Sequence, residues 1–190
     1  MKHSFVIATA AAALLSAAGN IKAAGPDPGA GAAYCTASGG VVIDRVPVYG
    51  TNNPPSAWLV LTQPRQFCQF TSPTDGSRIH VTVETLNATT PTLAALAYYA
   101  EVPYGGGGEG TPASYYCTQL GGSDQFGGVS AAGGGWVGKG SKDTVLEACI
   151  FPDMSSIDSW GLFYHSAGII RGIDLTGILK YAPPPTAAAQ

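Results

Sequence analysis

The chain has 190 residues and sparse charge, with 9 Lys and Arg against 12 Asp and Glu and a formal net charge of −3. Its 45% content of hydrophobic residues excludes a disordered composition, and its length suits one ordinary domain or two small ones. Lys and Arg are not clustered in the sequence, which argues against a surface that binds nucleic-acid phosphates.

The N-terminal segment has the pattern of an export signal. Lys2 supplies the positive start, residues 5–18 are apolar and rich in alanine, and small residues suitable for cleavage follow at Ala18, Ala23 and Ala24. The apolar run is short for a bilayer span, so a cleaved signal is favoured over the alternative of an uncleaved anchor. We therefore predict a periplasmic or extracellular protein with no stable membrane span.

An internal repeat dominates the rest of the sequence. The motif Tyr-Cys-Thr-x-x-Gly-Gly begins at Tyr34 and recurs 82 positions later at Tyr116. A Cys-x-Phe segment likewise begins at Cys68 and again at Cys149. We interpret this pattern as a tandem duplication. The predicted fold class is α+β, with two tandem small units, each a short helix packed on an antiparallel sheet with one disulfide.

The repeat and a run of glycines set the predicted domain boundaries. A Gly-rich segment is flexible and is typical of a linker between domains. The predicted organisation is a signal peptide at 1–24, repeat unit one at 25–103, a Gly-rich linker at 104–110, repeat unit two at 111–182 and a disordered tail at 183–190.

Unit one has the pattern of a helical turn followed by strands and a helix. The predicted elements are a turn at 32–35, strands at 41–43 with 46–49, 58–61, 67–70 and 78–85, and a helix at 92–100. Thr92 is the expected N-cap of that helix. The strand at 78–85 alternates, which places His80 on its polar face and Val81 on its apolar face.

Unit two repeats the first helix with clearer signals. Thr111 can cap it, Pro112 suits its first position and Gly121 can end it. A Gly-rich hairpin region is predicted at 123–140, a strand at 146–151, helical spacing of apolar residues from Ile157 to Tyr164, and a closing segment at 169–181.

Four cysteines in an exported chain predict two disulfide bonds. Because each unit contains one pair at nearly equal spacing, we predict the bonds Cys35–Cys68 and Cys117–Cys149. Closing loops of this size contributes roughly 3–4 kcal/mol each in the chain-entropy model. The alternatives are buried thiols or a metal site, and the absence of a Cys-x-x-Cys pair argues against zinc.

A set of residues in unit two carries a resemblance to a known domain. These residues are Ala113, Tyr116, Cys117, Gly121, Gly122, Cys149, Phe151, Pro152, Asp153, Trp160, Phe163 and Tyr164. Over about sixty residues unit two resembles a small Cys-containing domain of unknown function in exported bacterial proteins, often labelled haemolysin. Unit one resembles a degenerate copy. Many members have a further Cys after the aromatic pair, which this chain lacks. The resemblance implies export and a small mixed fold, and it implies no mechanism.

No catalytic constellation emerges from the sequence. His80 and His165 stand without a Ser or Cys nucleophile motif, and no His-Glu-x-x-His segment occurs. Asp153 has the context of a turn, and Asp158 that of a helix start, where negative charge is favourable. We therefore predict no catalytic residues, no metal and no cofactor.

Aromatic residues are the remaining candidates for a binding surface. Trp136, Tyr104 and Trp58 could line a groove for a glycan or a protein, and their alternative role is to build the core of a small domain. The predicted function is that of an exported, non-enzymatic protein that binds a protein or glycan partner through its loops. The alternative is a secreted membrane-active, haemolysin-like protein or a protease inhibitor.

Overall fold

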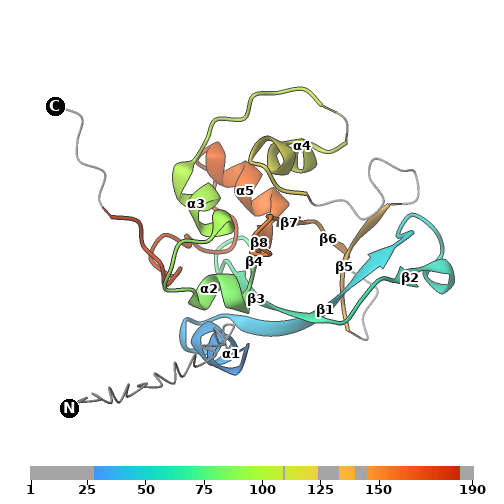
Figure 1. The fold of residues 1–190 in the computed structure, drawn as a ribbon, viewed down its shortest axis with the longest axis horizontal. Coiled ribbons are helices and arrows are strands. Elements are labelled where there is room, and N and C mark those ends of the chain that lie inside the picture. Colours follow the sequence, from blue (N-terminus) through green and yellow to red (C-terminus); the bar gives the residue numbers. More distant parts are fainter. Residues whose placement is uncertain (1–27, 109, 124–132, 140–144, 185–190) are drawn as a thin grey trace, which may run out of the picture.

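The computed structural model describes residues 28–108, 110–123, 133–139 and 145–184 as short helices around a curled antiparallel sheet (Figure 1). The elements in chain order are α1 (Pro28–Ala37), β1 (Val41–Tyr49), the 3-10 helix η1 (Pro55–Ala57), β2 (Leu59–Val60), β3 (Arg65–Thr71), β4 (Arg78–Thr82), α2 (Val83–Asn87), α3 (Leu93–Ala100), α4 (Pro112–Gln119), β5 (Gly134–Gly138), β6 (Val145–Leu146), β7 (Ala148–Ile150), β8 (Ser156–Asp158) and α5 (Ser159–Ser166).

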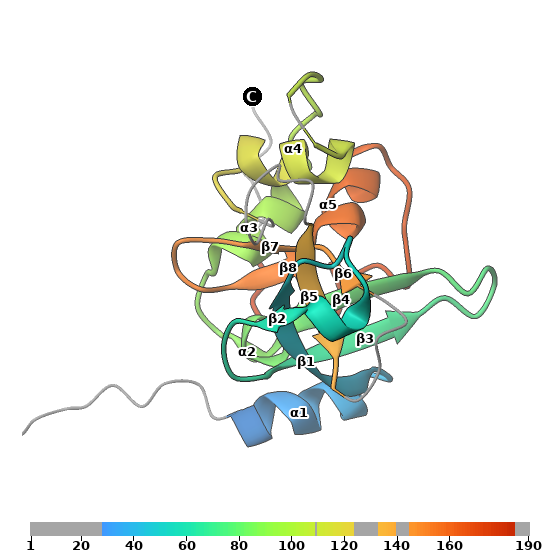
Figure 2. The same ribbon diagram turned by 90° about the vertical axis from the view of Figure 1, so that its right-hand side faces the viewer.

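The described strands form one sheet in the order β6-β5-β1-β3-β4-β8-β7, with β2 paired to the end of β1. All neighbouring strands run antiparallel. The two ends of this path, β6 and β7, are separated in the chain by Glu147 alone. The sheet therefore curls until its first and last strands meet (Figure 2).

The two faces of the curled sheet have different neighbours. On the outer face, Cys68 and Val81 are buried beneath the helices in the larger apolar cluster. On the inner face, Phe67 of β3 meets Trp136 of β5 edge to face, with ring centroids 5.3 Å apart. Because successive residues of a strand point to opposite faces, Phe67 and Cys68 belong to different cores.

Both predicted disulfide bonds are confirmed. Cys35–Cys68 joins α1 to β3, and Cys117–Cys149 joins α4 to β7. The glycine after each helix, Gly40 in one half and Gly122 in the other, lies directly against the disulfide of its own half.

The mixed helix-and-sheet class is confirmed, but a division into separate tandem units is not. β5 pairs along β1, and β8 meets β4 at the pair Val81–Ile157, so strands of the second predicted unit flank those of the first on both sides in one sheet. Residues of both halves also share the larger apolar cluster, including Leu86 and Leu162. The proposed domain boundaries therefore stay predictions.

The start of the predicted Gly-rich linker packs against α4 and α5. The Tyr104 ring lies edge to face with Tyr116 and Phe163, with centroids 6.2 and 5.1 Å apart. Gly105 N–H donates a 2.9 Å hydrogen bond to Gln119 Oε1. These contacts give this part of the segment a defined path.

The strand predicted at 78–85 is shorter in the structure, because β4 ends at Thr82 and α2 follows directly. The hydroxyls of Thr82 and Thr85 lie 2.7 Å apart, and Thr85 Oγ1 accepts the Ser156 N–H at 3.1 Å. These buried hydrogen bonds stabilise the change from strand to helix, which alternation alone did not indicate.

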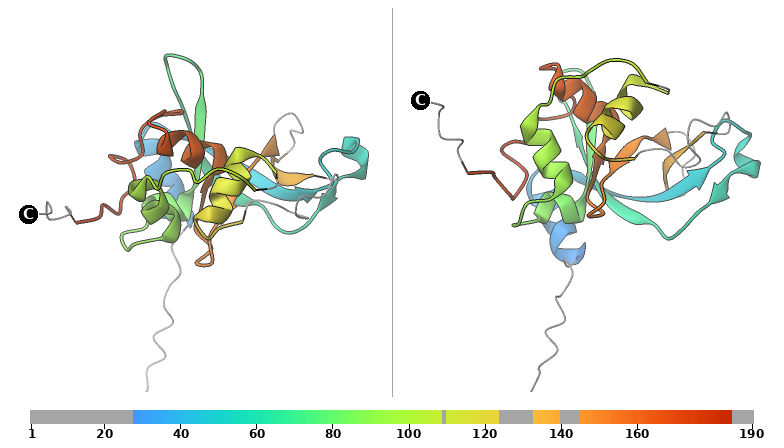
Figure 3. Two further views of the ribbon diagram at one scale, coloured as in Figure 1. Left: turned by 90° about the horizontal axis from the view of Figure 1, so that it is seen from above. Right: turned by 45° about the horizontal axis from the view of Figure 1, so that its top comes forward.

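The hairpin of β1 and β2 projects from the body of the molecule (Figure 3). The apolar strand predicted at 58–61 lies here, and only Leu59 and Val60 are in β2. Both side chains are exposed, as is Leu61. The predicted strand is therefore confirmed only at Leu59 and Val60, which pair with β1 at the margin of the sheet.

Several predictions concern residues outside the described part of the chain. They are the signal peptide at 1–24, most of the tail at 183–190 and the centre of the hairpin region at 123–140. Within the described residues, none of the helices is both long enough and apolar enough to cross a bilayer.

The start of α3 is held by the turn that follows β7. Thr92 caps the helix as predicted, its hydroxyl accepting the Ala95 N–H. Asp153 Oδ2 accepts the Leu93 N–H at 2.7 Å, and Asp153 Oδ1 accepts the Ser155 hydroxyl at 2.6 Å. Burial raises the pKa of the Asp153 carboxyl, but these hydrogen bonds outweigh burial and lower the pKa below its ordinary value of 3.8.

We expect Asp153→Asn to lower the free energy of unfolding at neutral pH by about 0.5–1 kcal/mol, because a charged acceptor at a helix start is lost. A lowered native pKa stabilises the fold above pH 3.8, and this stabilisation is lost as the pH falls through the native pKa. Urea unfolding of both proteins at neutral and acid pH should therefore show a difference that shrinks in acid. Asp44→Asn, at an exposed residue, is the control, and an equal difference at both pH values would contradict this assignment.

Candidate functional site

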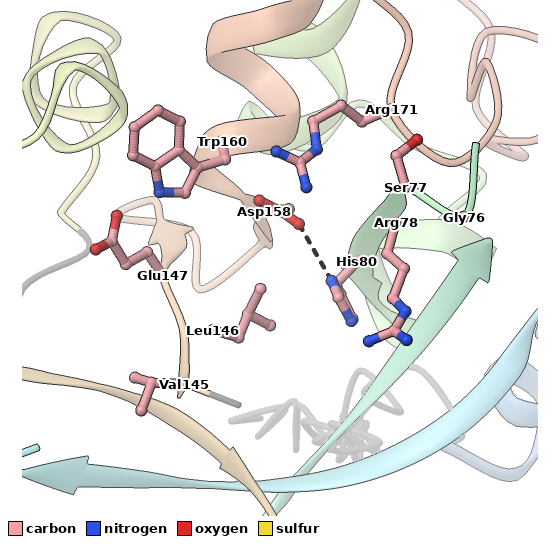
Figure 4. A pocket seen from close by; sticks show the side chains of 10 residues that line it. All are labelled: Gly76, Ser77, Arg78, His80, Val145, Leu146, Glu147, Asp158, Trp160 and Arg171. Carbon is pink, nitrogen blue, oxygen red and sulfur yellow. Dashed lines mark hydrogen bonds and ion pairs between the residues drawn. The ribbon is translucent and has the colours of Figure 1, made fainter. Parts of the chain in front are cut away.

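A pocket of about 290 Å³ is bordered by β4, β6 and the junction of β8 with α5 (Figure 4). We call it the polar pocket. Its lining residues are Gly76, Ser77, Arg78, His80, Val145, Leu146, Glu147, Asp158, Trp160 and Arg171. Residues from both halves of the sequence therefore build one site, which the mouth of a curled sheet commonly provides.

A buried histidine and carboxylate lie at the base of the polar pocket. His80 Nδ1 is 3.1 Å from Asp158 Oδ2, and each residue is 5% exposed. Asp158 Oδ1 accepts the Gly161 N–H at 3.0 Å and so caps α5, as its sequence context indicated. One carboxylate thus fixes both the helix start and the imidazole.

The burial of His80 corrects the prediction from alternation. Its face of β4 was expected to be the polar, solvated side of a half-buried strand. That face instead looks toward the interior of the curled sheet, where Gln69 Oε1 lies 3.0 Å from His80 Nε2. A curled sheet buries both of its faces, so a polar side chain on the inner face needs buried partners.

Arg45 of β1 completes this buried network. Its Nη2 is 3.2 Å from His80 Nε2, its Nη1 donates to the Trp136 carbonyl at 3.2 Å, and the residue is 4% exposed. Burial lowers the pKa of Arg45; the charge of Arg78 adds to this effect, and that of Asp158 opposes it.

The contacts of His80 occupy both of its ring nitrogens. Nδ1 lies 3.1 Å from Asp158 Oδ2, and Nε2 lies 3.2 Å from Arg45 Nη2, a group that only donates. Nε2 also lies 3.0 Å from Gln69 Oε1. The ring nitrogen that a general base would direct at a substrate is therefore occupied, which favours a structural role for the pair.

The walls of the polar pocket combine an indole with charged groups. Trp160 packs on Tyr164, with ring centroids 5.8 Å apart. In Figure 4, Glu147 lies on one side of the indole and Arg171 on the other. The Arg171 guanidinium carbon is 5.2 Å from the Tyr164 ring centroid, and Glu147 Oε2 accepts the Thr111 hydroxyl at 3.2 Å.

A larger hollow of about 680 Å³ lies between α2 and the turn after β7. Its charged groups are engaged with neighbouring protein groups. Arg65 Nη2 is 3.7 Å from Glu84 Oε2 and donates to the Met154 carbonyl at 3.0 Å, while Lys180 Nζ donates to Asn87 Oδ1 at 2.9 Å. The polar pocket is smaller, but it places an indole beside charged groups, so we take it as the candidate site.

The three aromatic residues predicted for a binding surface lie in different environments. Trp136 is 3% exposed in the inner apolar cluster, so its assignment to a surface is corrected. It is buried because its side of β5 faces the interior of the curl. Tyr104 packs on α4 and α5, and the half-buried Trp58 follows η1, where its Nε1 donates to the Asn53 carbonyl at 2.8 Å.

Sequence reasoning did not assign Trp160, Glu147 or the arginines of the pocket to a site. Trp160 carried a signal, since it is the Trp of the motif that supports the domain resemblance. Glu147, Arg78 and Arg171 carried none, because they are far apart in the sequence and ordinary in their local context.

His165 belongs to a separate buried cluster. Its ring stacks on Tyr98 with centroids 3.8 Å apart and planes 5° apart, and His165 Nε2 is 3.2 Å from Glu101 Oε1. Burial raises the pKa of the Tyr98 hydroxyl. His165 thus packs with α3, whereas His80 packs inside the sheet. No group of three His, Cys, Asp or Glu side chains in the described part of the chain could hold a metal ion.

The chain matches no protein-family model, and comparisons with curated proteins and with solved structures found no match either. The resemblance to a small exported domain therefore stays a hypothesis.

Proposed function

We propose that this protein is an exported, non-enzymatic binding protein that holds a glycan in the polar pocket. The observation that carries the proposal is the Trp160 indole set between a guanidinium and a carboxylate, Arg171 and Glu147. A sugar ring has an apolar face that packs on an aromatic ring, and its hydroxyls both donate and accept hydrogen bonds. A pocket of this volume lies at the lower end of the range for small ligands, about 300–1,000 Å³, and suits a single sugar ring.

Two further features support the proposal. His80 Nε2 is engaged by Arg45, which disfavours acid–base chemistry by this ring. Two disulfide bonds are typical of proteins in oxidising compartments such as the periplasm or the extracellular space.

We expect Trp160→Ala to weaken glycan binding at least tenfold, about 1.4 kcal/mol, because the apolar face of the sugar loses its platform. The measurement is calorimetric titration with a panel of short neutral and acidic oligosaccharides. Trp58→Ala is the matched control, because Trp58 lies next to η1 in the projecting hairpin of β1 and β2, away from the pocket. This substitution should leave the affinity unchanged. Equal affinity of the Trp160 variant and the parent protein would overturn the proposal, provided that both unfold at the same temperature.

A glycoside hydrolase is the second candidate, because the polar pocket contains two carboxylates, Glu147 and Asp158, beside the indole. Hydrolases of this kind use one carboxylate as acid and the other as base or nucleophile. Release of new reducing ends by the parent protein, lost in Glu147→Gln, would replace the binding proposal with this one. If Glu147→Gln still binds the glycan and neither protein releases reducing ends, the result supports the binding proposal.

The membrane-active and inhibitor functions are tested in parallel. Liposome leakage, or inhibition of a protease, that is unaffected by Trp160→Ala would assign the activity to another surface and contradict a role centred on this pocket.

We also propose that the two halves arose by duplication, as the repeat in the sequence suggests. In each half the chain leaves a helix through two glycines and forms a strand pair next to the disulfide. The pairs are Val41–Gln69 in one half and Ser123–Ile150 in the other. In each half the first α-helix also packs on the next α-helix along the chain, α1 on α2 and α4 on α5.

A further inference from the structure

The charges around the polar pocket do not cancel. Among the described residues, Arg78 and Arg171 line the pocket with Glu147 and Asp158, and Arg45 lies behind it against His80. Three positive charges against two negative charges leave one positive charge. This local excess contrasts with the formal net charge of −3 of the whole chain.

The excess positive charge is on the wall of the pocket and not beneath it. Arg45 and Asp158 are both buried and are bridged by His80, so these two charges compensate each other within the sheet. The carboxylate of Glu147 accepts a hydrogen bond from the Thr111 hydroxyl, which holds it in place. The charge that remains for a ligand belongs to Arg78 and Arg171.

Arg171 is positioned to bind an anion. Its guanidinium stacks on Tyr164, which limits its rotation, and its Nε is buried without a hydrogen-bond acceptor among the described residues. In Figure 4 its guanidinium points into the pocket near Asp158, and the guanidinium of Arg78 lies beside His80.

We infer that the glycan of the proposed function is an acidic saccharide with one carboxylate per bound sugar ring, which Arg78 and Arg171 recognise. This inference rests on the proposed glycan binding. Arginine matches a planar carboxylate through two parallel hydrogen bonds, and one excess positive charge balances one carboxylate. A doubly charged phosphate would place a second negative charge near Glu147, whereas sugar hydroxyls can donate to that carboxylate.

The test compares two oligosaccharides that differ only in the oxidation state of carbon 6, a glucuronic acid oligomer and its glucose counterpart, by calorimetric titration. The parent protein should bind the acidic oligomer at least tenfold more tightly. Arg171→Gln and Arg78→Gln should each reduce this preference several-fold while weak binding of the neutral oligomer persists. Arg171→Lys, which keeps the charge but not the planar fork, should retain part of the preference.

Arg65→Gln is the matched control, because Arg65 pairs with Glu84 outside the polar pocket, and its preference should equal that of the parent protein. Thermal unfolding of each variant shows whether it folds. Equal affinity for both oligomers would overturn the carboxylate inference and leave glycan binding intact. Failure to bind either oligomer or any of the panel, with binding of an acidic peptide instead, would overturn both.

Discussion

Replacing Gly122 with alanine is expected to destabilise the protein far more than replacing its neighbour Gly121. A Cβ on Gly122 would collide with Cys149 Sγ and would stand 2.9 Å from Cys117 Sγ. Gly121 has a φ of +84° but open space around it. Overpacking against a disulfide should lower the free energy of unfolding by about 2–3 kcal/mol, whereas a left-handed alanine at Gly121 should lower it by about 1 kcal/mol.

Urea unfolding of the oxidised proteins measures this difference, and a count of reactive thiols shows whether the Cys117–Cys149 bond still forms. The first half of the chain repeats the experiment, since a Cβ on Gly40 would collide with Cys68 Sγ while Gly39 has open space. The same order of effects is expected there. If Gly121→Ala and Gly122→Ala, or Gly39→Ala and Gly40→Ala, lower the free energy of unfolding equally, the second glycine is not required for close packing on the disulfide.

Asp158→Ala is expected to lower the free energy of unfolding by about 3–5 kcal/mol, because it removes one partner of a buried charged network. Arg45 and His80 would remain buried, with the positive charge of Arg45 no longer balanced. The substitution also removes the cap of α5. Thr92→Ala, which removes only the cap of α3, is the control and should lower the free energy of unfolding by about 1 kcal/mol.

A double-mutant cycle with His80→Gln separates the network from the helix cap. If the carboxylate acts through the imidazole, the two substitutions should be non-additive, with a coupling energy of about 0.5–3 kcal/mol. Additive losses would mean that Asp158 acts through Gly161 N–H alone. Chemical denaturation of the four proteins gives all the values that the cycle needs.

The features predicted correctly from the sequence are those that depend on a few neighbouring residues or on the repeat. Thr92, Thr111 and Asp158 cap helices because a side-chain oxygen reaches N–H groups in the next turn of the chain. Gly121 ends α4 because glycine adopts a positive φ without strain. The disulfide pairing followed from the repeated cysteine spacing.

The features that sequence reasoning missed depend on how the sheet curls. Alternation along 78–85 and in β5 shows which residues share a face, but not whether that face meets water or the opposite side of the same sheet. His80 and Trp136 are buried because the curl brings β1, β4, β5 and β8 around one interior. Arg45, His80 and Asp158 lie 35 and 78 positions apart in the sequence, so only long-range strand pairing places their charges within hydrogen-bonding distance.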